Sequence, residues 1–218
     1  MCPVAFRLAL AGSLLVALAA CLPTAQQNDR PDVAVVGGPT ENRVPGLADD
    51  LQELLLQEFA PLPYDFIDRR IVAFQETHRE MHGARAPLQA AFIARAFGGE
   101  LSVLVGAPLY RREVEGVQDA FGDKRVVTTI VQVHIAVVEP RHALVIAALD
   151  SGIHRSVRFE PAELPLLPLS EDPGLKRDRR EALQDVAGPL AAQLSSLLAA
   201  TCSNRAGSAG TPPGCAPR

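Results

Sequence analysis

The chain has 218 residues, 48% of them hydrophobic and 21% charged, which is enough for one domain with a sizeable core. Its 21 basic and 25 acidic residues give a formal net charge of −4. Because no basic run or basic helix face appears, this balance argues against binding to nucleic acid and against electrostatic adhesion to anionic lipid.

The first twenty residues have the pattern of an export signal. Arg7 is their only charge, and an apolar run at 8–18 follows it. The run is too short to span a bilayer as a mature helix, and the polar residues at 26–30 give it no stop-transfer flank. The sequence therefore predicts a signal peptide over residues 1–20, cleaved between Ala20 and Cys21.

The end of this signal, Leu18-Ala19-Ala20-Cys21, resembles the lipobox of bacterial lipoproteins. By that resemblance the thiol of Cys21 carries acyl chains such as palmitate, and two or more chains hold a protein on a membrane durably. Leu22, in place of the Asp that keeps many lipoproteins at the inner membrane, implies an outer-membrane anchor facing the periplasm if the cell has an outer membrane. The alternative is a secreted protein with a chance cysteine at its cleavage site.

Residues 21–31 are predicted to be the acylated cysteine and a linker, because the segment is polar and bounded by proline. Ten extended residues reach about 35 Å, so the globular part is expected to sit close to its membrane. A single globular domain is predicted over residues 32–200, followed by a flexible Gly/Ser/Pro-rich tail over 201–218.

The first half of the domain predicts alternating strands and helices. A compact apolar run at 33–36, stopped by Gly37-Gly38-Pro39, indicates a buried strand. Leucines at helical spacing predict a helix over 47–59, and a short strand is expected at 64–67. Helices over 69–82 and 88–96 follow, and residues 101–109 return to strand character.

The second half predicts a long antiparallel hairpin and a closing helix. Residues 126–138 alternate in character, 139–142 form a turn with Pro140, and 143–149 are a second apolar run. The charged segment at 109–125 is expected to be a connection, as is the proline-rich segment at 161–173. A leucine and valine stripe from Leu183 to Leu198 predicts the last helix.

This order predicts an α/β (α+β) fold, a mixed sheet with a long antiparallel hairpin, covered by helices. The layout resembles the fold shared by the TolB amino-terminal domain, the curli secretion lipoprotein CsgG and the penicillin-binding-protein activator LpoB. Four segments carry the resemblance, at 33–38, 66–70, 94–106 and 131–151. The resemblance implies no catalytic residues.

Two cysteines remain in the tail. Cys202 and Cys215 bracket a stretch rich in Gly, Ser and Pro that could close on itself in an oxidising envelope. A disulfide and two free thiols are both consistent with the sequence, because nothing in it fixes the separation of the two sulfurs.

The best candidate for metal chemistry is His78-Arg79-Glu80-Met81-His82. Histidines four apart share a helix face and can grip one metal, but Arg79 stands where the zincin motif has Glu. The alternative is two solvated histidines at a helix end. No nucleophile elbow, phosphate loop or Cys-His pair occurs, so neither a cofactor nor a catalytic residue is predicted.

The leading interpretation is therefore a non-enzymatic, membrane-anchored envelope lipoprotein. It would bind an envelope protein or support the assembly of an envelope complex, and a second copy of the chain is one candidate partner. The alternative is a metal- or small-ligand-binding lipoprotein that uses His78 and His82.

Overall fold

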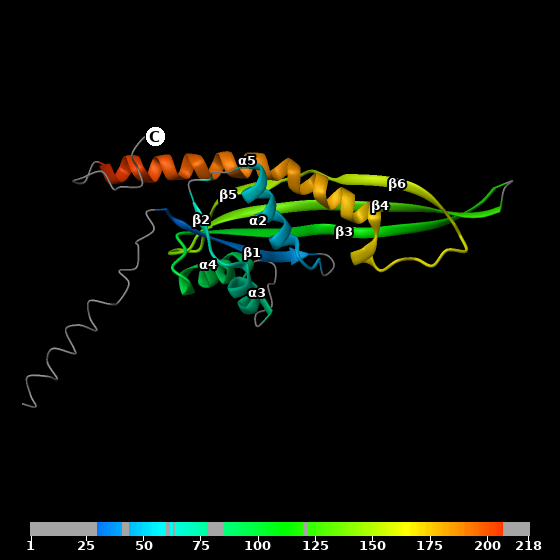
Figure 1. Ribbon diagram of the computed structural model, residues 1–218, viewed down its shortest axis with the longest axis horizontal. Helices are drawn as coiled ribbons and strands as arrows, with labels where there is room; N and C mark the ends of the chain where they lie inside the picture. The colour runs from blue at the N-terminus through cyan, green and yellow to red at the C-terminus, as the bar shows by residue number, and fades with distance from the viewer. Residues whose placement is uncertain are drawn as a thin grey trace, which may run out of the picture.

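The computed structural model describes residues 30–40, 44–59, 62, 64–77, 85–119 and 122–206 (Figure 1). They form one six-stranded mixed sheet with the strand order β2-β1-β3-β4-β5, and β6 lies beside β4 on the same edge as β5. Among these residues, no helix is both long enough and apolar enough to cross a membrane.

Two strands dominate the sheet. β3 (Leu101–Asp119) and β4 (Gly122–Glu139) pair antiparallel along their whole length. β1 (Asp32–Thr40) pairs parallel with the first part of β3 and with β2 (Asp65–Phe66). On the other side of β4, β5 (Leu144–Asp150) pairs with its end and β6 (His154–Pro161) with its beginning.

Helices lie on both faces of the sheet. α2 (Leu47–Glu58) and α5 (Pro173–Ala206) pack on one face, where Leu51, Leu55 and Leu190 are fully buried. α3 (Arg69–Thr77) and α4 (Ala86–Ala96) cover the other face through Val72 and Ile93. The short helix η2 (Leu169–Glu171) precedes α5. These three layers account for both apolar cores.

The sheet has two halves of different character. We call the proximal half β1, β2, β5, residues 101–107 of β3 and residues 132–139 of β4. We call the distal half β6, residues 108–119 of β3 and residues 122–131 of β4. In Figure 1 the start of β1 and the end of α5 lie at the proximal end, and the far ends of β3 and β4 project at the other.

The local sequence explains the elements at the proximal end. α4 ends where Gly98 adopts a φ of +74°, which lets the Gly99 N–H donate to the carbonyl of Ala94. Gly106 lies where β3 passes close to β1, since a Cβ there would collide with the Pro39 carbonyl oxygen. The glycines therefore mark a helix end and a close approach of two strands.

The predicted mixed sheet with a long antiparallel hairpin, covered by helices, is confirmed. Three boundaries differ from the predictions. The segment 109–125 is not a connection, since β3 runs through it to Asp119 and β4 begins at Gly122. β6 was not predicted, and its last residue, Pro161, opens the segment expected to be a connection. α5 continues to Ala206, six residues into the predicted tail.

Candidate protein-binding surface

Most of the predicted site residues lie outside the described residues. These are Ala20, Cys21, His78, His82 and Cys215. Cys202 falls in the last turns of α5, but its side chain is not described. The anchor, the disulfide and the metal site therefore stay predictions.

The remaining histidines are held by separate acidic partners. His142 Nδ1 lies 3.1 Å from Glu139 Oε2, and His154 Nε2 lies 3.0 Å from Asp185 Oδ2. His134 Nδ1 lies 3.7 Å from Asp150 Oδ2. In the part of the chain that the structure describes, no three His, Cys, Asp or Glu side chains gather as a metal site would require.

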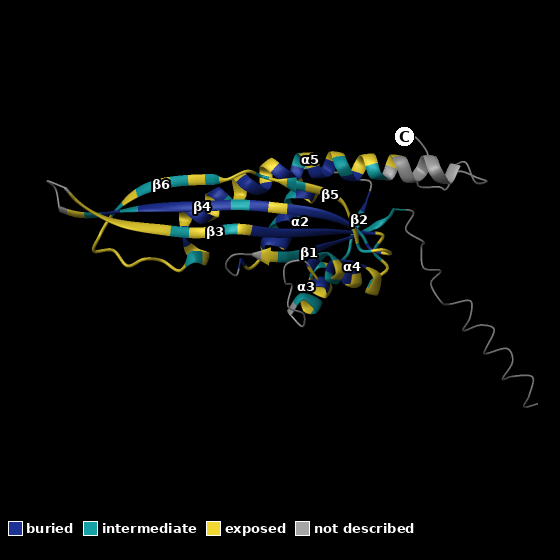
Figure 2. Ribbon diagram, turned by 180° about the vertical axis from the view of Figure 1, so that it is seen from behind, coloured by how far each residue is buried: buried dark blue, intermediate teal, exposed yellow. Residues whose placement is uncertain are grey.

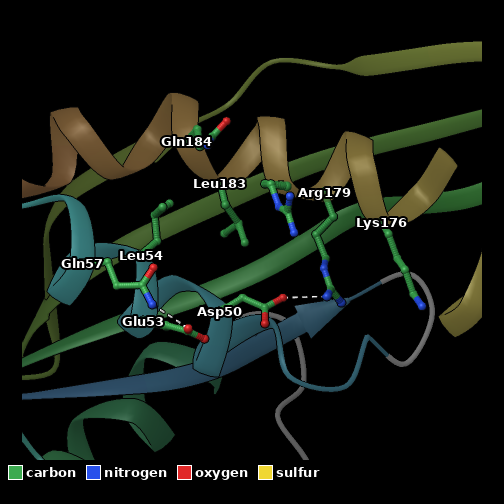
Figure 3. Close-up of a pocket in the computed structure, with 9 residues that line it drawn as sticks. Asp50, Glu53, Leu54, Gln57, Lys176, Arg179, Leu183 and Gln184 are labelled. Atoms are coloured by element: carbon green, nitrogen blue, oxygen red, sulfur yellow. Dashed lines mark hydrogen bonds and ion pairs between the residues drawn. The ribbon is translucent and has the colours of Figure 1, made fainter. Parts of the chain in front are cut away.

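A hollow of about 430 Å³ lies between α2 and α5 (Figure 3). Part of its polar lining is engaged: Arg179 Nη2 lies 2.6 Å from Asp50 Oδ2, and Gln57 Nε2 donates to Glu53 Oε1 at 2.7 Å. Burial raises the pKa of Asp50, as do Asp49 and Glu53, and Arg179 opposes the shift. The Asp50–Arg179 pair connects α2 with α5, whereas the Glu53–Gln57 bond lies within α2.

Buried charged side chains link the distal half to α5. We call the contacts of Asp172 with Arg112 and Arg158 the staple. Asp172 caps α5, because its Oδ1 accepts the N–H groups of Gly174 at 2.9 Å and Leu175 at 3.1 Å. Its Oδ2 accepts from Arg112 of β3 at 2.9 Å and from Arg158 of β6 at 2.5 Å. One fully buried carboxylate thus joins two strands to a helix N-terminus.

The protonation of Asp172 reflects these contacts. Burial by itself raises the pKa of its carboxyl, but hydrogen bonds from Arg158, Arg112 and the Leu175 N–H outweigh burial and lower the pKa below its ordinary value. Gly174 leaves room for this arrangement, since a Cβ there would lie 2.5 Å from Arg158 Nη1.

Further hydrogen bonds, from Arg125 and to Asp178, extend the staple. Arg125 donates to Glu160 Oε2 at 2.6 Å and to the carbonyl of Leu164 at 2.6 Å. Asp178 of α5 accepts from Thr129 of β4 at 2.5 Å and from Ser156 of β6 at 2.8 Å. Hydrogen-bonded charged side chains therefore hold the distal strands on this face, whereas an apolar core holds the proximal strands.

The opposite face of the distal half is open. Cross-strand pairs place Val126 beside Phe159, Thr128 beside Val157, and Lys124 between Val117 and Pro161 on that face. Phe159 is 70% exposed and Val157 55% exposed. Seen from behind, the tip formed by β3 and β4 projects beyond the described helices (Figure 2).

The open face combines an apolar strip with a charged border. The strip consists of Val117, Val126, Val157 and Phe159, and a hollow of about 270 Å³ lies beside Val117 and Phe159. The β3 residues opposite it, Arg111, Glu113 and Glu115, are exposed charges. An aromatic and aliphatic centre with a charged rim is the composition of a protein interface.

Sequence reasoning missed this surface, although part of its signal was present. Val157 and Phe159 alternate with Arg158 and Glu160, the period of a strand. That pattern predicts the apolar residues on the inside, however, whereas the structure places them outside because Arg158 and Glu160 turn toward Asp172 and Arg125.

No protein-family model matches this sequence, and no curated protein matches it either. Solved structures similar to it include the lipoprotein GNA1162 from Neisseria meningitidis, at 11% identity and a TM-score of 0.37, over 76% of this chain and 99% of that one. The PelC dodecamer from Paraburkholderia phytofirmans gives 12% identity and a TM-score of 0.37, over 73% of this chain and 86% of that one. The LpoB C-terminal domain from Salmonella enterica gives 11% identity and a TM-score of 0.34, over 57% of this chain and 82% of that one.

Proposed function

We propose that this chain is a non-enzymatic, lipid-anchored protein of the bacterial cell envelope that binds a protein partner through the open face of the distal half. The envelope address comes from the export signal and from the lipobox-like Leu18-Ala19-Ala20-Cys21. By the same resemblance, Leu22 favours an outer-membrane anchor facing the periplasm if the cell has an outer membrane.

The observation that carries the binding role is the outward-facing pair Val157 and Phe159 on a strand held rigidly from behind. A fixed surface loses little conformational entropy on binding, so its buried apolar area converts efficiently into affinity. Large apolar side chains gathered on one exposed face, with charges along one side, mark an interaction site.

The experiment is site-specific photocrosslinking in intact cells, with a photoreactive residue at position 159. The matched control carries the same residue at Gln184, an exposed position on α5. We expect a discrete product from position 159 that is absent from position 184, and we expect less of it when Cys21→Ser removes the anchor.

The mass of the product identifies the partner class. A product of twice the chain mass identifies a second copy, and any other discrete mass identifies a different envelope protein. Equal products from positions 159 and 184, or no product from 159, would contradict binding through the open face.

A further inference from the structure

Three consecutive apolar residues are exposed at the opposite, proximal end of the sheet. Leu144, Val145 and Ile146 begin β5 and are 58%, 48% and 40% exposed. A run of this kind on a surface is unfavourable in water unless something covers it.

A tight turn precedes this run, and a β-bulge lies within it. Ala143, directly before the run, has a φ of +56°, a conformation that side chains with a Cβ rarely adopt. The turn before it is fixed by Glu139, whose carboxylate accepts the N–H groups of Arg141 at 2.9 Å and His142 at 2.8 Å. In β5, Val138 pairs with Val145 and Val137 with Ala147, so Ile146 is an extra residue in a bulge.

The run lies next to the place where the chain enters the domain. Strand pairing aligns Ala34, Ser102, Val138 and Val145 in one row across β1, β3, β4 and β5. Three strand spacings separate Ala34 from Val145, which is roughly 15 Å. Pro31 and Ile146 also line one hollow of about 550 Å³.

A lipid anchor at Cys21 would therefore keep this end of the domain close to the membrane. Ten extended residues reach about 35 Å, whereas the far end of β3 lies roughly 55 Å along the strand from Ser102. A membrane tether at Cys21 thus keeps the run at high effective concentration beside the bilayer.

Charges of both signs lie at this end, so charge selects neither anionic nor cationic headgroups. Asp32, Asp65 and Glu100 lie beside the chain entry, where burial, Asp65 and Glu100 raise the pKa of Asp32. Arg30 Nη1 lies 3.9 Å from Asp65 Oδ1, and Arg95 and Arg141 line the same hollow as Glu100 and Ile146. Zwitterionic lipid is therefore the compatible surface.

We propose that Leu144, Val145 and Ile146 contact the zwitterionic surface of the membrane that carries the anchor. This inference rests on the proposed lipid anchor at Cys21. The contact would hold the proximal end down and turn the distal open face away from the bilayer, toward partners in the periplasm.

The absence of tryptophan from the chain permits a direct test. Leu144→Trp and Phe159→Trp each introduce a single tryptophan at an exposed apolar position, one at each end of the sheet. The full chain of each variant, purified from membranes, is reconstituted into phosphatidylcholine vesicles brominated on their acyl chains. Flotation reports anchoring, and quenching reports contact of the tryptophan with lipid.

We expect both variants to float, with quenched and blue-shifted fluorescence only for Leu144→Trp, unchanged at high salt. Flotation without quenching at position 144, or with quenching at 159 instead, would overturn the contact while leaving the anchor intact. If neither variant floats, the anchor fails, and the same variants are mixed with the vesicles as soluble protein. Quenching at 144 in that arm supports the contact, and its absence overturns it.

Discussion

The proximal and distal halves of the sheet are held together by different forces. In the proximal half, helices cover both faces of β1 and of the adjoining parts of β3 and β4, where Val35 on one face and Val36 on the other are fully buried, while the edge strand β5 is exposed. In the distal half one face is fixed by Asp172, Arg158 and Arg112, and the other is open. In the distal strands, charged side chains thus make the contacts with α5 on one face, and the apolar side chains of Val157 and Phe159 lie on the other.

The largest effect is expected when the staple is broken. Asp172→Ala removes the cap of α5 and leaves Arg112 and Arg158 without their shared carboxylate, so we expect a loss of about 3–5 kcal/mol in the free energy of unfolding. Urea denaturation measures it. The neighbouring exposed change Glu171→Ala should cost less than about 0.5 kcal/mol. Equal stability of the two variants would show that the staple does not hold the distal half.

A matched pair of valines tests burial across the two halves. Val133→Ala in the proximal core should lower the free energy of unfolding by about 2 kcal/mol, because its side chain is fully buried. Val157→Ala in the distal half should change it by less than about 0.5 kcal/mol. Both replace valine by alanine in a strand, so the difference isolates burial; comparable losses would mean that the open face is covered in solution.

Acid should loosen β6 and the start of α5 before β1. The pKa of Glu160 is lowered by hydrogen bonds from Arg158 and Arg125, and that of Asp172 is also lowered. Groups with a lowered folded-state pKa contribute stability above about pH 4, their ordinary range, and lose it as pH falls through the folded-state values.

Asp32 at the proximal end has a raised pKa and behaves in the opposite way. Its carboxylate opposes folding above the folded-state pKa, and this penalty fades as pH falls. Amide hydrogen exchange at pH 7 and near pH 3 should therefore show β6 and the start of α5 losing protection before β1. Loss of amide protection in β1 before β6 would contradict this prediction.

The smallest expected effect concerns zinc. If His78 and His82 held a metal, excess zinc would raise the melting temperature by linkage, and a double His→Ala variant would lose that rise. We expect no rise, because a zinc site takes at least three protein ligands and the sequence assigns no third one beside His78 and His82. A rise that disappears in the double variant would support the metal-binding alternative.

The periodicity of hydrophobic residues predicted the elements that pack in an apolar environment. It failed for the elements whose contacts are polar. The apolar run at 33–36, the leucines of α2 and the alternation in β4 each located an element to within a few residues. The charges at 109–119 concealed the distal part of β3, because a strand with an open face and a polar staple needs no apolar alternation. The predicted anchor at Cys21 depends only on local sequence and needs no tertiary contact.

By itself, the sequence determined the order of the elements other than β6, the mixed sheet with its long hairpin and the expectation of an envelope address, because these follow from local patterns of hydrophobicity and turn residues. Only the tertiary structure decided that Asp172 meets Arg112, sixty residues away, that Phe159 faces outward, and that Val145 lies beside the entry of the chain. Each of these depends on which strands pair and in which register. A local pattern states how buried a residue should be, but the long-range pairing selects its neighbours.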